Sequence, residues 1–184
     1  IYDIDQDGYN EVLCVMDKEF RILAGSNGKI KNSFKLPDEN AHDCIIIANL
    51  TGNEEAQDII LKNRYSKLWA VDNNFKQLWI YEGNVGHYPW PYDFNKDGFD
   101  EIVAGYDFLD HNGKKIWSCK NLDDHADCIW IGNVSSSTGD EVDIVIGGSV
   151  TVLYDWHGSE LWRYEGSVES QHVALGRFCH DRDE

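Results

Sequence analysis

The stretch from His87 to Gly105, HYPWPYDFNKDGFDEIVAG, decides the fold class of this chain. An aromatic run leads into the acidic loop 93–101, and an aliphatic run follows the loop. Short runs of aromatic and β-branched residues are typical of strands, and a glycine within the loop permits a sharp turn. The stretch therefore predicts two β-strands joined by an acidic loop.

This strand–loop–strand pattern is repeated along the chain. It recurs in IYDIDQDGYNEVLCV from Ile1, in HDCIIIANLTGNEEAQDIILK from His42 and in HADCIWIGNVSSSTGDEVDIVIGG from His125, and it begins again at Gln171. The first polar residues of the four loops are Asp3, Asn49, Asp93 and Asn133. They are 46, 44 and 40 residues apart, a spacing that is typical of β-propeller blades with four strands each.

The second half of each repeat supplies two further strands. A turn sequence such as LDHNG or LYDWHG precedes a segment that carries one recurring aromatic residue. These residues are Phe34, Trp79, Trp117 and Trp162. We expect each of them to pack one blade against the next, with ligand binding as the alternative. No stretch shows sustained helical periodicity.

These patterns predict an all-β fold, a β-propeller fragment of about four four-stranded antiparallel blades plus the start of a fifth. The expected boundaries within the single region 1–184 are residues 1–40, 41–84, 85–124, 125–170 and, for the partial blade, 171–184. Because the chain opens on Ile1 and not on Met, we interpret it as part of a larger propeller. The remaining blades of that propeller are expected partners.

The net charge of the chain argues against one class of binding partner, the nucleic acids. Asp and Glu total 33 against 16 Lys and Arg, which gives a formal net charge of -17. Binding to nucleic acid needs a basic surface, so we expect no nucleic-acid partner. No apolar run approaches the ~18 residues of a membrane span. The five cysteines lack CxxC spacing and indicate neither a zinc site nor a disulfide framework.

Two of the loops carry a calcium-binding pattern. In DIDQDGYNE and DFNKDGFDE, oxygen-bearing side chains recur at loop positions 1, 3, 5 and 9, and a backbone carbonyl is available at position 7. The expected ligands are Asp3, Asp5, Asp7, Tyr9 and Glu11 in the first loop, and Asp93, Asn95, Asp97, Phe99 and Glu101 in the second. Calcium prefers such oxygen ligands, so we expect Ca²⁺ as a structural cofactor.

The other two loops, which start at Asn49 and Asn133, keep polar side chains but little charge. We interpret them as turns held by side-chain hydrogen bonds, with calcium binding as the alternative. Both asparagines also match glycosylation sequons, but their place in the repeat favours the turn interpretation.

Four histidines recur just ahead of the expected innermost strands, namely His42, His87, His125 and His172. The innermost strands of a propeller line its central channel, so we expect these residues to converge at one mouth of the channel. Imidazole titrates near neutral pH and can transfer a proton or bind a metal. The alternative is that each histidine only bonds to a neighbouring blade.

The candidate site residues follow from this expected convergence. The catalytic candidates are His87, His125, Tyr88 and Arg177. The substrate-binding candidates are His42, His172, Trp90 and Asp127. Trp90 lies between two prolines, which remove donors from an inner strand and favour an irregular, shaped site.

The acidic loops resemble those of FG-GAP repeats, the calcium-loop blades of integrin α-chain propellers. Together with LWIYEG, LWRYEG, GHYPWPYDF and HADCIWIGNV, they resemble the catalytic propeller of bacterial rhamnogalacturonan lyases. The resemblance implies β-elimination in an acidic plant-type polysaccharide or other glycan. A cation neutralises the uronate carboxylate, a base removes the C5 proton and an acid assists the leaving oxygen. Calcium or Arg177 would take the first role, and His87, His125 or Tyr88 the others.

Two non-enzymatic interpretations stand beside the lyase. One is a calcium-stabilised FG-GAP-like propeller that binds glycan or protein, and the other is an inert structural propeller. Histidines clustered with an arginine would favour the enzyme, whereas an open aromatic platform would favour the binding protein. We expect the protein to act outside the cell or at the cell surface.

Overall fold

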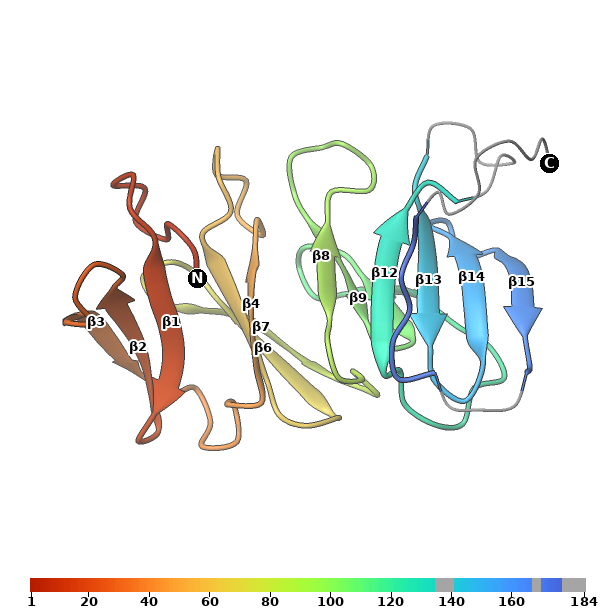
Figure 1. The fold of residues 1–184 in the computed structure, drawn as a ribbon, viewed down its shortest axis with the longest axis horizontal. Helices are drawn as coiled ribbons and strands as arrows, with labels where there is room; N and C mark the ends of the chain where they lie inside the picture. Colours follow the sequence, from red (N-terminus) through yellow and green to blue (C-terminus); the bar gives the residue numbers. More distant parts are fainter. Residues whose placement is uncertain (135–140, 167–169, 177–184) are drawn as a thin grey trace.

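The computed structural model describes residues 1–134, 141–166 and 170–176. Within these ranges the chain forms 15 strands in four antiparallel sheets and no helix, which confirms the predicted all-β fold class. The described residues include no helix that is long and apolar enough to cross a membrane. Figure 1 shows the four sheets side by side in chain order, as an open series rather than a closed ring.

Each sheet is a meander whose strands pair in the order of the sequence. The first sheet contains β1 (Glu11–Met16), β2 (Glu19–Ala24) and β3 (Ile30–Lys35). The second contains β4 (Cys44–Ala48), β5 (Asp58–Lys62), β6 (Lys67–Val71) and β7 (Gln77–Glu82). The third contains β8 (Trp90–Tyr92), β9 (Glu101–Ala104), β10 (Asp107–Leu109) and β11 (Lys115–Ser118). The fourth contains β12 (Cys128–Gly132), β13 (Asp143–Gly147), β14 (Thr151–Asp155) and β15 (Glu160–Tyr164).

The first sheet has three strands where four were expected. Its innermost position holds only an isolated bridge between Tyr2 and Glu11, which matches the pair Tyr92 and Glu101 in the third sheet. A single bridge is too short to count as a strand. Residues 170–176 contain no strand, and the rest of the expected fifth repeat lies outside the described residues.

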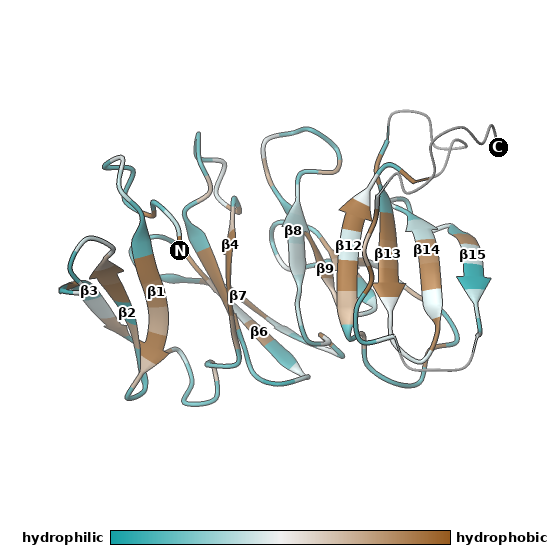
Figure 2. Cartoon of the chain, viewed as in Figure 1, coloured by the Kyte–Doolittle hydropathy of each residue, from teal (hydrophilic) through white to brown (hydrophobic). Residues whose placement is uncertain are grey.

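In the second, third and fourth sheets the second strand is mostly aliphatic because both of its faces are covered. All five residues of β5 are buried. Ile59 and Leu61 pack in a cluster with Phe20 of the preceding sheet, whereas Ile60 packs with Ile102 of the following sheet. This two-sided burial explains the continuous aliphatic runs, which an alternating pattern would not provide. In Figure 2 the hydrophobic colour follows β12 and β13 and gives way to hydrophilic residues in β15.

In each sheet a buried carboxylate begins the strand that follows the first loop of the repeat, namely β1, β5, β9 or β13. These residues are Glu11, Asp58, Glu101 and Asp143, and none is more than 3% exposed. Each accepts a hydrogen bond from a backbone N–H of the preceding loop, donated by Ile4, Leu50, Phe94 and Val134 respectively. The acidic residue therefore closes the loop in all four repeats, including the two that lack the calcium pattern.

Three of the four recurring aromatic residues join neighbouring sheets, as the packing interpretation predicts. The indole N–H of Trp79 on β7 donates to the carbonyl of His111, at 2.8 Å, in the β10–β11 turn. Trp117 on β11 donates to the carbonyl of Trp156, at 3.0 Å, in the β14–β15 turn. In the first sheet Phe34 stacks on Phe75 of the β6–β7 turn, with ring centroids 4.8 Å apart.

Candidate functional site

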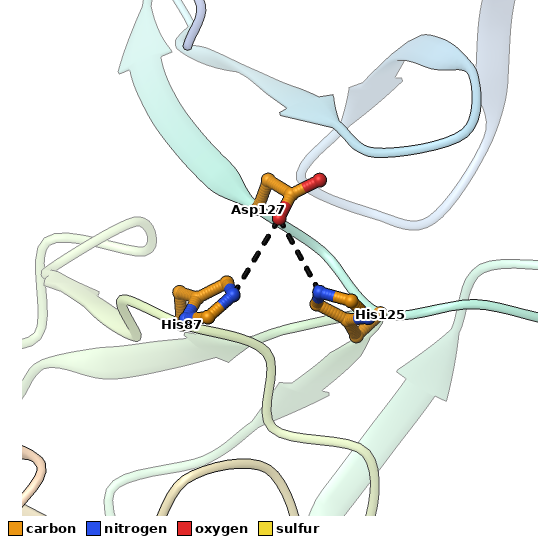
Figure 3. Close-up of side chains that lie close together, drawn as sticks. All are labelled: His87, His125 and Asp127. Atoms are coloured by element: carbon orange, nitrogen blue, oxygen red, sulfur yellow. Dashed lines mark ion pairs between the residues drawn. The ribbon is translucent and has the colours of Figure 1, made fainter. Parts of the chain in front are cut away.

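Three of the predicted site residues meet at one point. His87 precedes β8, His125 precedes β12, and Asp127 directly precedes β12. The Nε2 atoms of His87 and His125 lie 3.5 Å and 3.3 Å from Oδ1 of Asp127, and Figure 3 shows both imidazoles directed toward this oxygen. The two imidazole centroids are 5.1 Å apart. We call these three residues the histidine cluster.

Asp127 is the buried member of the histidine cluster. Only 4% of the residue is exposed, and its Oδ2 has no hydrogen-bond partner among the described residues. Its backbone N–H donates to the carbonyl of Gly147, which fixes the position of the side chain. A buried carboxylate needs a positive charge close by, because desolvation strongly penalises the ionised form. A protonated imidazole or a bound metal ion would provide that charge.

The environment of His87 favours a neutral imidazole. Burial lowers its pKa below the ordinary value, and the neighbouring His125 lowers it further, against the opposing charge of Asp127. A neutral imidazole has a nitrogen lone pair for a metal ion or for a proton. His87 is therefore suited to act as a ligand or as a base at neutral pH.

A comparison with the second sheet shows what Asp127 lacks. Asp43 and Asp127 are equivalent, since each donates its backbone N–H to the last residue of the neighbouring second strand, Lys62 and Gly147 respectively. The fully buried ammonium of Lys62 lies 2.7 Å from a carboxylate oxygen of Asp43. Gly147 carries no such side chain, and among the described residues no lysine forms an ion pair with Asp127. The substitution of glycine for lysine favours a cation from solution at Asp127.

Tyr65, in the β5–β6 turn, packs against the histidine cluster, and Arg64 packs against Tyr65. The ring of Tyr65 lies 4.7 Å from that of His125 and 5.1 Å from that of His87. The guanidinium of Arg64 lies 5.2 Å from the centre of the Tyr65 ring. Sequence reasoning missed both residues, because they belong to a turn that carries no repeated pattern.

The other predicted site residues are distributed differently. His42 and His172 are exposed and do not belong to the histidine cluster. Tyr88 is 58% exposed, and its ring centroid lies 6.2 Å from that of His87. Trp90 is half-buried, and its ring centroid lies 5.4 Å from that of Trp130 in the next sheet. Arg177 lies outside the described residues.

The first calcium-type loop contains a built-in cation. The Nζ atom of Lys31, on β3, lies 2.6 Å from an oxygen of Asp5, 2.9 Å from Asp7 and 3.0 Å from Glu11. The three carboxylates raise the pKa of Lys31, so the ammonium stays charged. Lys31 therefore lies among the predicted ligands, where carboxylate oxygens of Asp3, Asp5 and Glu11 come within 4.8 Å of one another, and its ammonium would compete with a bound calcium.

The loop 93–101 carries the same pattern of oxygen-bearing side chains. Asp93 accepts hydrogen bonds from the N–H groups of Asp97 and Gly98, which curls the loop around its oxygens. The Nδ2 atom of Asn95 donates to Glu101 at 2.9 Å. Within the described part of the chain no ammonium or guanidinium group pairs with this loop, so its oxygen donor set fits the ion.

The loop at Asn49 is a turn, as its low charge suggests. Asn49 accepts a hydrogen bond from the backbone N–H of Asn53 and donates to the carbonyls of Asn53 and Gly98. Asp58 accepts bonds from both the N–H and the hydroxyl of Thr51. Most of the corresponding loop at Asn133 lies outside the described residues.

The acidic loops and the histidine cluster lie at opposite ends of the sheets. The loops follow the innermost strands, whereas His87 and His125 precede them. In Figure 1 the acidic loops are at the upper end, and β12 begins at the lower end. The five residues of β12 span roughly 15 Å at the usual rise of a strand. A calcium ion held by a loop is therefore too far away to neutralise a substrate carboxylate at the histidine cluster.

Comparisons with known proteins identify structures of similar fold but do not show the activity of this chain. No family model matches the chain, and no curated protein matches its sequence. The V. cholerae biofilm matrix protein Bap1 is similar with a TM-score of 0.71 and 18% identity, over 92% of this chain and 28% of Bap1. The rhamnogalacturonan lyase YesW has a TM-score of 0.64 and 20% identity, over 82% of this chain and 31% of YesW.

A rhamnogalacturonan lyase of Bacillus licheniformis is similar to the same degree, with a TM-score of 0.60 and 20% identity over 83% of this chain and 31% of the enzyme. The chain thus spans about a third of the length of these proteins. Likeness at such identities shows a common β-rich fold. Since that fold serves a matrix protein as well as enzymes, function has to be argued from the site.

Proposed function

We propose that this protein is a carbohydrate-active propeller that cleaves a rhamnogalacturonan-type polysaccharide by β-elimination. The observation that carries the proposal is the histidine cluster, with two imidazoles on one buried carboxylate oxygen. The likeness to two rhamnogalacturonan lyases is in keeping with it. A polysaccharide substrate of this kind places the protein outside the cell or at its surface.

The histidine cluster supplies the donor set for a divalent cation. Two imidazole nitrogens and one carboxylate are ligands that Zn²⁺ and other first-row metal ions prefer, whereas Ca²⁺ prefers oxygen ligands. A bound cation would neutralise a uronate carboxylate and so acidify the adjacent proton. The exposed hydroxyl of Tyr88 is the proposed acid or base of the reaction, since the two imidazoles would then be occupied.

Calcium has a separate, structural role in this proposal. We assign one Ca²⁺ to the FG-GAP-like loop 93–101, where it would fix the link between β8 and β9. The first loop would keep Lys31 instead of a metal ion. Each cation thus serves one end of the molecule.

A second candidate function is glycan binding without cleavage. Exposed aromatic side chains lie on the innermost strands, where Tyr92 is 38% and Trp130 is 39% exposed, and Trp130 lies close to Trp90. Flat rings of this kind are suited to stacking on the faces of sugars. The likeness to the biofilm matrix protein Bap1 is in keeping with this candidate.

The formation of unsaturated uronate from rhamnogalacturonan, followed by its ultraviolet absorbance, tests the lyase. We expect activity in the wild type, its loss on removal of metal ions, and its recovery with one added divalent cation. Asp127→Asn should abolish activity because it removes the charged ligand. His157→Ala is the matched control, since His157 is exposed and lies at the other end of the sheets. Sugar binding without any product would exclude the lyase and favour the second candidate.

A further inference from the structure

Arg64 stands out among the arginines of this acidic chain. Arg21 pairs with Asp17 and Glu19, and Arg163 pairs with Glu160. Arg64 is exposed and forms no ion pair with any residue that the structure describes. In a chain with 33 acidic residues and a net charge of -17, a guanidinium without a carboxylate partner requires an explanation.

The side chain of Arg64 is held in place although it lacks an ion pair. Its Nε donates a hydrogen bond to the hydroxyl of Tyr65 at 3.0 Å, and the guanidinium lies against the Tyr65 ring. The two terminal nitrogens form no hydrogen bonds with described residues. Those nitrogens present parallel N–H groups, the arrangement that binds a carboxylate through both of its oxygens.

The turn that carries Arg64 is fixed by its backbone. The ammonium of Lys62 donates to the carbonyl of Arg64 at 2.7 Å. The carbonyl of Tyr65 accepts the N–H of Val85 at 2.8 Å, which ties the turn to the segment before His87. The side-chain oxygen of Asn63 accepts two further backbone N–H groups within the turn. The guanidinium is therefore positioned before any ligand binds, which reduces the entropy lost on binding.

The position of Arg64 connects it with the proposed site. The guanidinium and both imidazoles of the histidine cluster lie around one aromatic ring, that of Tyr65. The negative field of the protein would repel an anionic ligand unless a local cation attracts it. Arg64 supplies such a cation beside the histidine cluster.

We propose that Arg64, held by Tyr65, is a subsite for the carboxylate of an acidic sugar. This inference rests on the proposed function and specifies which part of the substrate is recognised. The carboxylate would lie across the two terminal nitrogens of Arg64, on a sugar unit next to the one at the histidine cluster. Arg64 thereby selects uronate units in the free-acid form over esterified ones.

The test compares two oligosaccharides of alternating galacturonate and rhamnose, one with free carboxylates and one with methyl esters. Their dissociation constants are measured by calorimetry for the wild type and for Arg64→Gln, Arg64→Lys and Arg21→Gln. We expect the wild type to prefer the free acid about tenfold or more, as for a charge-assisted pair. Arg64→Gln should lose this preference, Arg64→Lys should retain part of it, and Arg21→Gln should keep it whole.

The outcomes separate this inference from the proposed function. Equal preference for the free acid in the wild type and Arg64→Gln, or no binding of the free acid by the wild type, would overturn the subsite. If the wild type still cleaved the polysaccharide, the proposed lyase activity would be supported although the subsite was refuted. Loss of the preference in a variant with unchanged circular dichroism, without any cleavage by the wild type, would support the subsite and refute the lyase.

Discussion

At the scale of single residues, the clearest result is that lysines neutralise two of the acidic groups. Lys31 lies among the carboxylates of the first calcium-type loop, and Lys62 lies on Asp43. In the part of the chain that the structure describes, no lysine pairs with their counterparts, loop 93–101 and Asp127. We therefore expect a bound cation to take the place of the lysine in those two repeats, because a buried or crowded carboxylate is stable only when its charge is balanced.

Replacing Lys31 tests this exchange. In Lys31→Met the carboxylates of the first loop lose their internal cation, so their oxygens become available to calcium. We expect calorimetry to give one Ca²⁺ for the wild type and two for the variant. Lys29→Met, which removes a neighbouring exposed lysine, should bind one. An unchanged stoichiometry in Lys31→Met would show that the first loop is unable to hold calcium even without the lysine.

The ion pair between Glu160 and Arg163 makes a pH-dependent prediction. The hydrogen bonds from Arg163 lower the pKa of Glu160 to about 2. Arg163 also donates to the carbonyls of Lys120 and Asn121 and so ties β15 to the segment before β12. A carboxyl group with a depressed pKa adds stability above its ordinary pKa, and this stability is lost as the pH falls through the folded value.

Glu160→Gln should therefore be less stable than the wild type at neutral pH, by up to about 1 kcal/mol for a partly exposed pair. The difference should persist down to about pH 4.5 and should vanish as the pH approaches 2. Urea denaturation at several pH values measures it. A difference that does not change with pH would mean that Glu160 acts through packing and not through its charge.

At the scale of elements, the contact between neighbouring sheets depends on complementary sizes. Where the outer strand carries tryptophan, the facing turn carries a glycine with positive φ, as in Trp79 over Gly113 and Trp117 over Gly158. Where the outer strand carries Phe34, the turn carries Phe75 at a φ of 62°. A large ring thus meets a residue without a side chain, and a smaller ring meets another ring. Trp162 on β15 is 44% exposed, and we propose that a further repeat covers it.

Gly113→Ala tests this complementarity. A Cβ at this position would lie 2.6 Å from the indole of Trp79, and the residue has a φ of 75°. Backbone strain and overpacking together should cost roughly 2–4 kcal/mol of unfolding free energy, measured by urea denaturation.

Gly28→Ala is the matched control, because Gly28 has a φ of 68° and nothing within 4 Å of its added Cβ. Gly28→Ala should lose only the part of the unfolding free energy that is due to backbone strain, about 1–2 kcal/mol. Equal losses in the two variants would show that the packing of Trp79 on the turn contributes nothing to the stability.

At the scale of the whole molecule, the two ends of the sheets carry different candidate sites. The acidic loops lie at one end and the histidine cluster at the other, so calcium would stabilise the scaffold without taking part in the chemistry. A ligand that binds only the folded state raises stability according to its concentration and affinity.

His125→Ala should separate these two functions. We expect this variant to lose lyase activity and metal binding at the histidine cluster, while added calcium still raises its melting temperature as in the wild type. Asp97→Ala should show the opposite result, with a smaller calcium-induced shift and activity retained at low temperature. Thermal unfolding with and without calcium measures the stabilisation, and the absorbance assay measures the activity of each variant. Loss of the calcium shift in His125→Ala would mean that the two ends are coupled.

The sequence by itself determined the architecture of the repeat. The aliphatic runs that end in EIVAG and DIVIGG, the acidic residue before each of them and the aromatic residue on each outer strand all have local physical causes, and all lie where their patterns predict. The central residues of a strand that is buried on both faces must be apolar, and a loop that closes on a carboxylate must be followed by an acidic residue. Such requirements recur with every repeat and can therefore be recognised from the sequence.

Only the tertiary structure decided which of the recurring residues meet. His87 and His125 converge on Asp127, whereas His42 and His172, which looked equivalent in the sequence, do not. Convergence depends on the direction in which each linking segment turns between sheets, and a shift of one residue moves a side chain to another face. The contacts of Lys31 with the first loop were hidden for the same reason, because they join residues 20 or more positions apart in the sequence.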